Sequence, residues 1–119
     1  MRLLVVDDSK VMRNKIERSV KSHNVEVVGQ ASNGKDAIIM FRQLAPDLVT
    51  LDITMPEMDG LEVLDVLLAE NSEARILIIS ALADKSTAIE ALIRGALGFL
   101  CKPFDDIELN NALRELTED

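Results

Sequence analysis

The chain has 119 residues, 48% of them hydrophobic but only 3% aromatic, which suits one domain with an aliphatic core. Its 21 acidic residues exceed its 13 basic ones, and the formal net charge of −8 argues against nucleic-acid binding, which needs a basic surface. No apolar run approaches the roughly 20 residues of a membrane-spanning helix. Met1 leads directly into the first predicted strand, so we expect a cytoplasmic protein without a secretion signal.

Five short runs rich in Val, Ile and Leu predict β-strands. In chain order they are residues 3–6, 25–29, 47–51, 75–80 and 98–101. Because most of these runs are continuously apolar rather than alternating, they are typical of strands buried on both faces of a parallel sheet. The single cysteine, Cys101, lies in the last run and is predicted to be a buried, inert thiol.

Amphipathic stretches follow the strands and predict helices. After the cap signal Ser9, apolar residues recur every four positions at Met12, Ile16 and Val20. Similar stripes follow at Ala37, Phe41 and Leu44; at Leu61, Leu64 and Leu68; at Ile89, Leu92 and Ala96; and at Leu109, Leu113 and Leu116. Pro56 and Gly60 predict a turn before the third helix, Gly95 a stop to the fourth, and His23 is expected to be exposed.

Strand and helix therefore alternate five times along the chain. This order predicts a doubly wound α/β fold, in which helices cover both faces of a five-stranded parallel sheet. There is no linker or low-complexity tract, so we expect residues 1–119 to form one domain. In such folds the ligand binds beyond the carboxyl ends of the strands, so the residues that end the strands form the candidate site.

Chemically active side chains end four of the five predicted strands. They are Asp7 and Asp8 after the first, Asp52 at the third, Ser80 at the fourth and Lys102 at the fifth. Taken alone, Asp8 could merely cap the next helix, and Asp7 or Asp52 could be a solvated strand end. Five such groups meeting at one edge favour a shared site.

The chemistry of this edge points to a metal and a phosphoryl group. Neighbouring carboxylates repel one another unless a cation lies between them. Mg²⁺, or Mn²⁺ in its place, favours such oxygen ligands together with phosphate oxygens. A carboxylate beside the metal can attack phosphorus and form an aspartyl phosphate. Lys102 would neutralise an oxygen of that group and Ser80 would donate a hydrogen bond to it.

Four motifs, in order and with matching spacing, carry a resemblance to a known family. They are VVDDS, LDITMPEMDG, the Ser-Ala pair after RILII, and KPF. Over essentially the whole chain they resemble the receiver domain of two-component response regulators, in particular the single-domain, CheY-like type of chemotaxis. The resemblance implies a flavodoxin-like (βα)5 fold with strand order 2-1-3-4-5. It also implies Mg²⁺-dependent phosphorylation and dephosphorylation that the domain itself catalyses, without being a classical enzyme.

The resemblance assigns roles around the metal. Asp52 matches the phosphoacceptor, which a histidine kinase or a histidine phosphotransfer protein would phosphorylate. Asp8 matches a direct Mg²⁺ ligand, and Asp7 matches its acidic partner, which binds mainly through water. Thr54, two residues after Asp52, would supply its backbone carbonyl to the metal.

The resemblance also assigns a switch. Ser80 matches the switch hydroxyl and Lys102 the phosphate-binding lysine, with a cis peptide bond expected between Lys102 and Pro103. Phe99 matches the switch aromatic, although without the hydroxyl of Tyr it could equally be a plain core residue. On phosphorylation, the surface of the fourth helix, fifth strand and fifth helix would be remodelled for a downstream partner.

Charge is distributed unevenly between the first and last helices. The first carries Lys10, Arg13, Lys15, Arg18 and Lys21 against Glu17, and the last carries Asp105, Asp106, Glu108, Glu115, Glu118 and Asp119 against Arg114. These could be two solvated faces. The sharper hypothesis is that the basic first helix docks an acidic phosphodonor protein.

Two apolar residues, Ile93 and Leu97, lie beside the stripe of the fourth helix. They predict a small exposed patch for a partner or for a phosphorylation-dependent dimer, against the alternative of a monomer with scattered surface residues.

Three other functions remain open from the sequence. One is an aspartate-based phosphatase of the haloacid-dehalogenase type, although that type places its nucleophile after the first strand. Another is a flavodoxin-like cofactor binder, although the acidic sequence DDS would repel a phosphate. The last is a receiver domain from a longer regulator with a DNA-binding or enzymatic output domain.

Overall fold

The computed structural model describes residues 1–20, 24–55, 59–81 and 84–118. Its strands and helices alternate in the order β1 (Arg2–Val6), α1 (Lys10–Val20), β2 (Glu26–Ala31), α2 (Gly34–Leu44), β3 (Leu48–Asp52), α3 (Gly60–Glu70), β4 (Arg75–Ala81), α4 (Lys85–Arg94), β5 (Gly98–Lys102) and α5 (Asp106–Thr117). The predictions for four residues fall outside the described part of the chain: Lys21, His23, Pro56 and Asp119.

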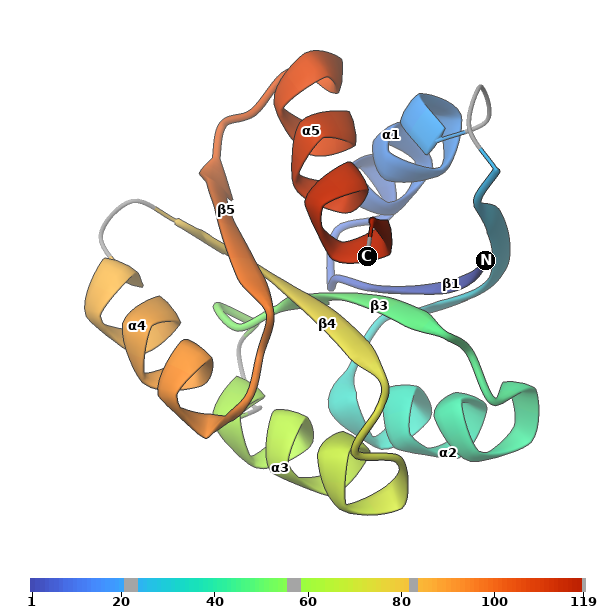
Figure 1. Cartoon of the computed structure of the whole chain (residues 1–119), viewed down its shortest axis with the longest axis vertical. Helices are drawn as coiled ribbons and strands as arrows, with labels where there is room; N and C mark the ends of the chain where they lie inside the picture. Colours follow the sequence, from blue (N-terminus) through green and yellow to red (C-terminus); the bar gives the residue numbers. More distant parts are fainter. Residues whose placement is uncertain (21–23, 56–58, 82–83, 119) are drawn as a thin grey trace.

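The five strands form one parallel sheet in the order β2-β1-β3-β4-β5, which confirms the predicted topology. In Figure 1, α1 and α5 cover one face of this sheet, while α2, α3 and α4 cover the other. Val6 pairs with Leu51, and Asp52 pairs with Ile79. This register brings the carboxyl ends of β1, β3 and β4 to the same edge of the sheet.

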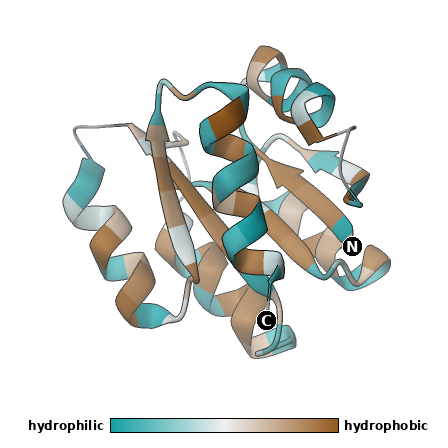
Figure 2. Ribbon diagram, turned by 45° about the horizontal axis from the view of Figure 1, so that its top comes forward, coloured by the Kyte–Doolittle hydropathy of each residue, from teal (hydrophilic) through white to brown (hydrophobic). Residues whose placement is uncertain are grey.

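Residues of the central strands alternate between two hydrophobic cores. Leu4, Val49 and Ile76 face α2, α3 and α4, whereas Leu3 and Leu77 face α1 and α5. The strands are accordingly hydrophobic throughout, and the helices have one hydrophobic and one hydrophilic side (Figure 2). Burial of each such Leu or Ile side chain stabilises the fold by about 1.5–3 kcal/mol. The central strands are therefore rigid and hold the residues at their carboxyl ends in place.

The expectation that all strands are buried on both faces is wrong at the edges of the sheet. β5 is half-buried along its length, and most of β2 is half-buried or exposed. An edge strand has a neighbour on only one side, so part of its surface faces solvent. For the same reason Cys101 is half-buried rather than buried as predicted.

The two helices that cover the first face of the sheet, α1 and α5, follow their predicted apolar stripes. In α1, Ile16 and Val20 are buried, and the Oγ of Ser9 accepts a hydrogen bond from the amide of Met12 at 3.2 Å, so Ser9 caps the helix as predicted. In α5 the buried residues are the three predicted ones, Leu109, Leu113 and Leu116.

The helices on the other face follow the prediction less closely. Ala37 and Phe41 of α2 and Leu64 of α3 are buried as expected, and Leu44, Leu61 and Leu68 are half-buried. The buried side of α3 also includes Val63 and Leu67. α3 lies between α2 and α4, so more of its surface is covered than one stripe predicts.

The stripe predicted for α4 is wrong at one residue. Ile89 is 47% exposed, and Ala88 and Ala91 take the buried positions against the sheet. A spacing of four residues fits the outer side of a helix as well as the inner one, and small alanines here allow the helix to approach the sheet. Gly95, with a φ of 122°, ends α4 as predicted. Within the described residues, no helix is long and apolar enough to cross a membrane.

Candidate functional site

Three carboxylates meet at the carboxyl edge of the sheet, as the sequence predicts. Asp7 directly follows β1 and Asp52 is the last residue of β3, so the pairing of these strands places the two side by side. One oxygen from each of Asp7, Asp8 and Asp52 lies within 4.8 Å of the others. Asp7 and Asp52 are each 1% exposed, whereas Asp8 is open to solvent. We call these three residues the acidic cluster.

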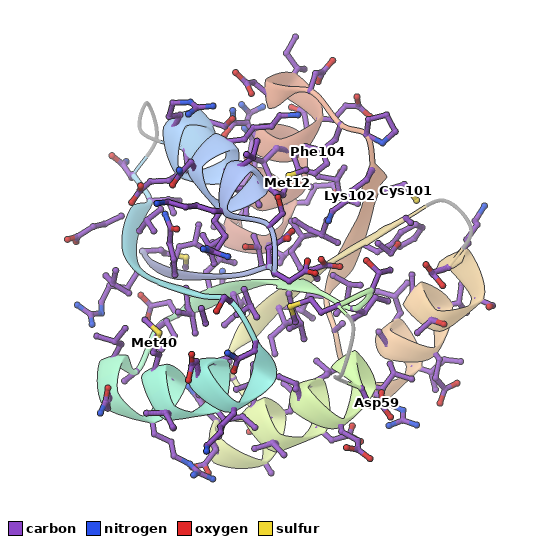
Figure 3. The ribbon with its side chains drawn as sticks, turned by 180° about the vertical axis from the view of Figure 1, so that it is seen from behind. Met12, Met40, Asp59, Cys101, Lys102 and Phe104 are labelled. Carbon is purple, nitrogen blue, oxygen red and sulfur yellow. The ribbon has the colours of Figure 1, made fainter. Side chains whose placement is uncertain are left out.

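Lys102 reaches this cluster from the last residue of β5. Its Nζ lies 3.1 Å from Oδ2 of Asp7 and 3.2 Å from Oδ2 of Asp52. Figure 3 shows the Lys102 side chain between β5 and the start of α1. If all three carboxylates are ionised, the ammonium of Lys102 leaves a net charge of −2. One divalent cation would neutralise it.

Both buried carboxylates are oriented by the residues that follow them. Oδ1 of Asp7 accepts a hydrogen bond from the amide of Ser9 at 2.8 Å. Oδ1 of Asp52 accepts two, from the amide of Thr54 at 2.8 Å and from its Oγ1 at 2.7 Å. In each case the other oxygen, Oδ2, faces Lys102. The sequence pointed only to the backbone carbonyl of Thr54, and its side-chain contact with Asp52 is a feature that the sequence did not reveal.

Burial and neighbouring charge shift the pKa values of the site. Burial raises the pKa of Asp7, and the negative charge of Asp52 raises it further, against the lowering effects of the Ser9 amide and Lys102. Burial opposes the charged form of Lys102, but the carboxylates of Asp52 and Asp7 outweigh it and raise the pKa of the ammonium. Lys102 is therefore held as a cation beside an acidic cluster in which Asp7 is costly to ionise.

Ser80 and Phe99 lie outside this hydrogen-bonded group, Ser80 near the carboxyl end of β4 and Phe99 at the second residue of β5. Ser80 is fully buried near the end of β4, and its Oγ has no hydrogen-bond partner among the described residues. A buried hydroxyl without a partner costs about 1–3 kcal/mol, so Ser80 would gain from a new acceptor nearby. Phe99 is half-buried and packs against the core under α2, α3 and α4. The peptide bond between Lys102 and Pro103 is cis, as expected.

The structure changes the interpretation of the basic first helix. The guanidinium of Arg13 donates to the backbone carbonyl of Asp7 at 2.7 Å and to Oε1 of Gln30 at 3.2 Å. Lys15 donates to the carbonyl of Phe104. Both side chains therefore hold the domain together, and no spacing in the sequence signals these contacts. Of the described basic residues of this helix, only Lys10 and Arg18 are exposed.

The donor set of the acidic cluster fits a hard divalent cation. Its ligand atoms are all carboxylate oxygens, which Mg²⁺ and Mn²⁺ prefer, and the exposed Asp8 leaves the cluster open for water or phosphate oxygens. A doubly wound α/β fold with these carboxylates and a half-buried lysine at its carboxyl edge defines a protein class suited to binding a metal and an anionic oxygen group there.

Comparisons with known proteins narrow this class to one family. The family model for the response regulator receiver domain matches residues 3–114. The chemotaxis protein CheY of Listeria monocytogenes is 41% identical over 115 residues, covering 97% of both chains. A protein-glutamate methylesterase/protein-glutamine glutaminase of Halalkalibacterium halodurans is 42% identical over 92% of this chain, but only 32% of its own length is covered.

A solved structure agrees with the sequence relatives. The CheX–CheY–BeF3–Mg complex of Borrelia burgdorferi contains a chain that matches with a TM-score of 0.93 and 30% identity, over all of this chain and 90% of that one. The chain belongs to the response regulator receiver domain family, and so to two-component signal transduction. This match favours a receiver over the phosphatase and the cofactor binder that the sequence left open.

Proposed function

We propose that this chain accepts a phosphoryl group on Asp52 from a histidine kinase or a histidine phosphotransfer protein. The observation that carries the proposal is the setting of Asp52, which is buried, held at Oδ1 by Thr54 and faces Lys102 with Oδ2. An oxygen held this way is a positioned nucleophile beside a fixed positive charge.

The transfer would proceed by attack of an Asp52 oxygen on the phosphorus of the phosphohistidine. The new oxygen–phosphorus bond forms as the phosphorus–nitrogen bond breaks, and the donor imidazole leaves with the electron pair. Lys102 would follow the negative charge by moving its ammonium from the carboxylates to a phosphoryl oxygen. Mg²⁺ or Mn²⁺, held by Asp7, Asp8, Asp52 and the Thr54 carbonyl, would neutralise further charge on the phosphoryl group.

The same group would operate the switch. The Oγ of Ser80 has no partner among the described residues, so a phosphoryl oxygen would give it the hydrogen bond that it lacks. Its movement, with an inward turn of the half-buried Phe99, would alter the surface of α4, β5 and α5. A state favoured by phosphate contacts would then bind a downstream protein more tightly. The names of the relatives support chemotaxis as the process.

The partners follow from the exposed surfaces. The exposed cations of α1, Lys10 and Arg18, would meet the phosphodonor, and a kinase donor would place the chain in the cytoplasm. We propose that residues 1–119 form one receiver domain without nucleic-acid or membrane binding of its own. The alternative is a receiver within a longer regulator, for which the methylesterase relative is a precedent.

The test is intact mass spectrometry after incubation with acetyl phosphate, with and without Mg²⁺. We expect one added phosphoryl group on the wild type only when Mg²⁺ is present, and none on Asp52→Asn. Asp59→Asn is the matched control, because Asp59 is an exposed helix cap that asparagine can replace. Absence of both the adduct and beryllofluoride binding, with a known receiver labelled in parallel, would refute the proposal.

A further inference from the structure

A polar seam joins α1 to α5 on one face of the sheet. The two helices lie side by side (Figure 1). The Oγ of Ser19 donates to Oδ1 of Asp106 at 2.6 Å, and Nδ2 of Asn110 donates to the carbonyl of Ser19 at 3.2 Å. Ser19 is buried, so these bonds are partly shielded from water, and they fix the two helices relative to each other.

Lys15 extends this seam to the segment that follows Lys102. Its Nζ donates to the backbone carbonyl of Phe104 at 2.6 Å and lies 4.7 Å from the centroid of the Phe104 ring. The first contact is a charge-assisted hydrogen bond and the second a cation–π contact, both stronger away from water. Phe104 itself is 4% exposed and belongs to the core under α1 and α5. Figure 3 shows Phe104 beside Met12 of α1, close to Lys102.

Lys102 needs such an anchor because of its place in the fold. It ends β5, an edge strand that is half-buried, yet its ammonium must reach Asp7 and Asp52. The next residue, Pro103, is exposed and has no backbone N–H to donate. Phe104 is therefore the first buried point after Lys102, and Lys15 holds it from a helix that begins three residues after Asp7.

We propose that Lys15 is a positioning residue of the phosphoryl-transfer site. By fixing the carbonyl and ring of Phe104 on α1, it sets the distance between the acidic cluster and the ammonium of Lys102. Lys15 does not touch the reacting atoms and acts through Lys102. The proposal rests on the function proposed above, and it adds a residue of α1 to the machinery of that site.

The test compares Lys15→Met, Lys15→Arg and a matched control, Lys35→Met, which removes an exposed lysine of α2. We expect the maximal rate of phosphorylation by acetyl phosphate to fall about tenfold in Lys15→Met, the order expected for a small misplacement of a catalytic group. The Mg²⁺ affinity and the half-saturating acetyl phosphate concentration should change less than the rate, since Lys15 contacts Phe104 and not the acidic cluster itself. Lys15→Arg, which keeps the charge and the donor, should recover most of the rate, and Lys35→Met should match the wild type.

Amide hydrogen exchange at Phe104, Asp105 and Glu108 gives an independent reading of the anchor. We expect faster exchange in Lys15→Met than in Lys35→Met. Three results would overturn this proposal alone. They are a wild-type phosphorylation rate in Lys15→Met, a loss of rate that Lys15→Arg does not restore, and an amide exchange rate in Lys15→Met equal to that of Lys35→Met. A wild type that takes up no phosphoryl group would refute the proposed function instead, and the exchange rates would still show whether Lys15 anchors the segment.

Discussion

One carboxylate of the acidic cluster, that of Asp7, is ionised in the folded protein at a cost to its stability. Asp7 has a raised pKa because it is withdrawn from water and lies beside Asp52. A carboxyl whose pKa is higher in the folded than in the unfolded state destabilises the fold when both states are ionised. That penalty is full above the folded-state pKa, shrinks as the pH falls through it, and is gone below the unfolded-state pKa. Binding of a cation between the carboxylates would offset it.

We therefore expect Asp7→Asn to stabilise the metal-free protein at pH 7. The midpoint of thermal unfolding should rise by about 2–5 °C, the change that a stabilisation on the order of 1 kcal/mol produces in a domain of this size. The gain should disappear as the pH is lowered through the carboxyl range, because the wild-type carboxyl then becomes protonated and is uncharged, like the asparagine. Thermal unfolding in EDTA across this pH range measures both effects. Asp59→Asn should show no such gain, and a lower midpoint for Asp7→Asn at pH 7 would contradict the argument.

At the scale of single elements, α1 serves both the interior of the domain and its surface. Arg13 and Lys15 turn toward Asp7 and Phe104 and hold the site, while Arg18 is exposed on the same helix. Reversing the charge of Arg13 would disturb the carbonyl of Asp7, and with it every phosphorylation route. Arg18 is exposed, so a change at Arg18 can test docking of the phosphodonor without disturbing the site.

We expect Arg18→Glu to slow phosphorylation by the cognate histidine kinase but to spare acetyl phosphate. Electrostatic steering between a cationic helix and an acidic partner acts on the association rate, so a loss of about threefold to tenfold at low salt is reasonable, with less at high salt. Rates from both donors at two salt concentrations test this. Equal rates for wild type and variant with the kinase would exclude docking through Arg18, and equal losses with both donors would point to damage to the site.

Gly60 lies so close to Ile53 that its position leaves no room for a side chain. A Cβ on Gly60, the first residue of α3, would lie 2.7 Å from the Cα of Ile53. Ile53 directly follows Asp52, so this close approach also fixes the chain at the nucleophile. Of the turn predicted from Pro56 and Gly60, the described residues include only Gly60, which begins α3 and packs against Ile53.

Across the whole molecule, the described surface carries one row of exposed apolar side chains on and after α4. Ile89, Ile93 and Leu97 are 47%, 75% and 58% exposed, at successive intervals of four residues. The exposure predicted for Ile93 and Leu97 is confirmed, and Ile89 extends the row. On another side of this helix, the exposed Arg94 pairs with Asp65 of α3 at 2.7 Å. The row therefore lies on a helix that is tied to its neighbour.

We expect Ile93→Lys to weaken whatever association phosphorylation induces, while leaving stability within about 0.5 kcal/mol, as is usual for exposed positions. The measurements are sedimentation velocity of the beryllofluoride-treated protein and binding of the downstream target, for wild type and variant. Ile39→Lys, another exposed isoleucine but on α2, outside the proposed partner surface, is the control. A monomer in every state, with target binding unaffected by Ile93→Lys, would show that the row is ordinary surface.

The sequence by itself determined the order of elements, a parallel sheet and the candidate members of the acidic cluster, while the strand order was implied by the family resemblance. Periodicity reports which residues are buried, and parallel strands bring their carboxyl ends to one edge of the sheet, where Asp7 and Asp52 were expected. Only the tertiary structure decided which side of α4 faces the sheet, how far the edge strand β5 is covered, and which side chains orient the cluster. The contacts of Thr54, Arg13 and Lys15 depend on distances between elements that are separate in the sequence, and no local spacing encodes such distances.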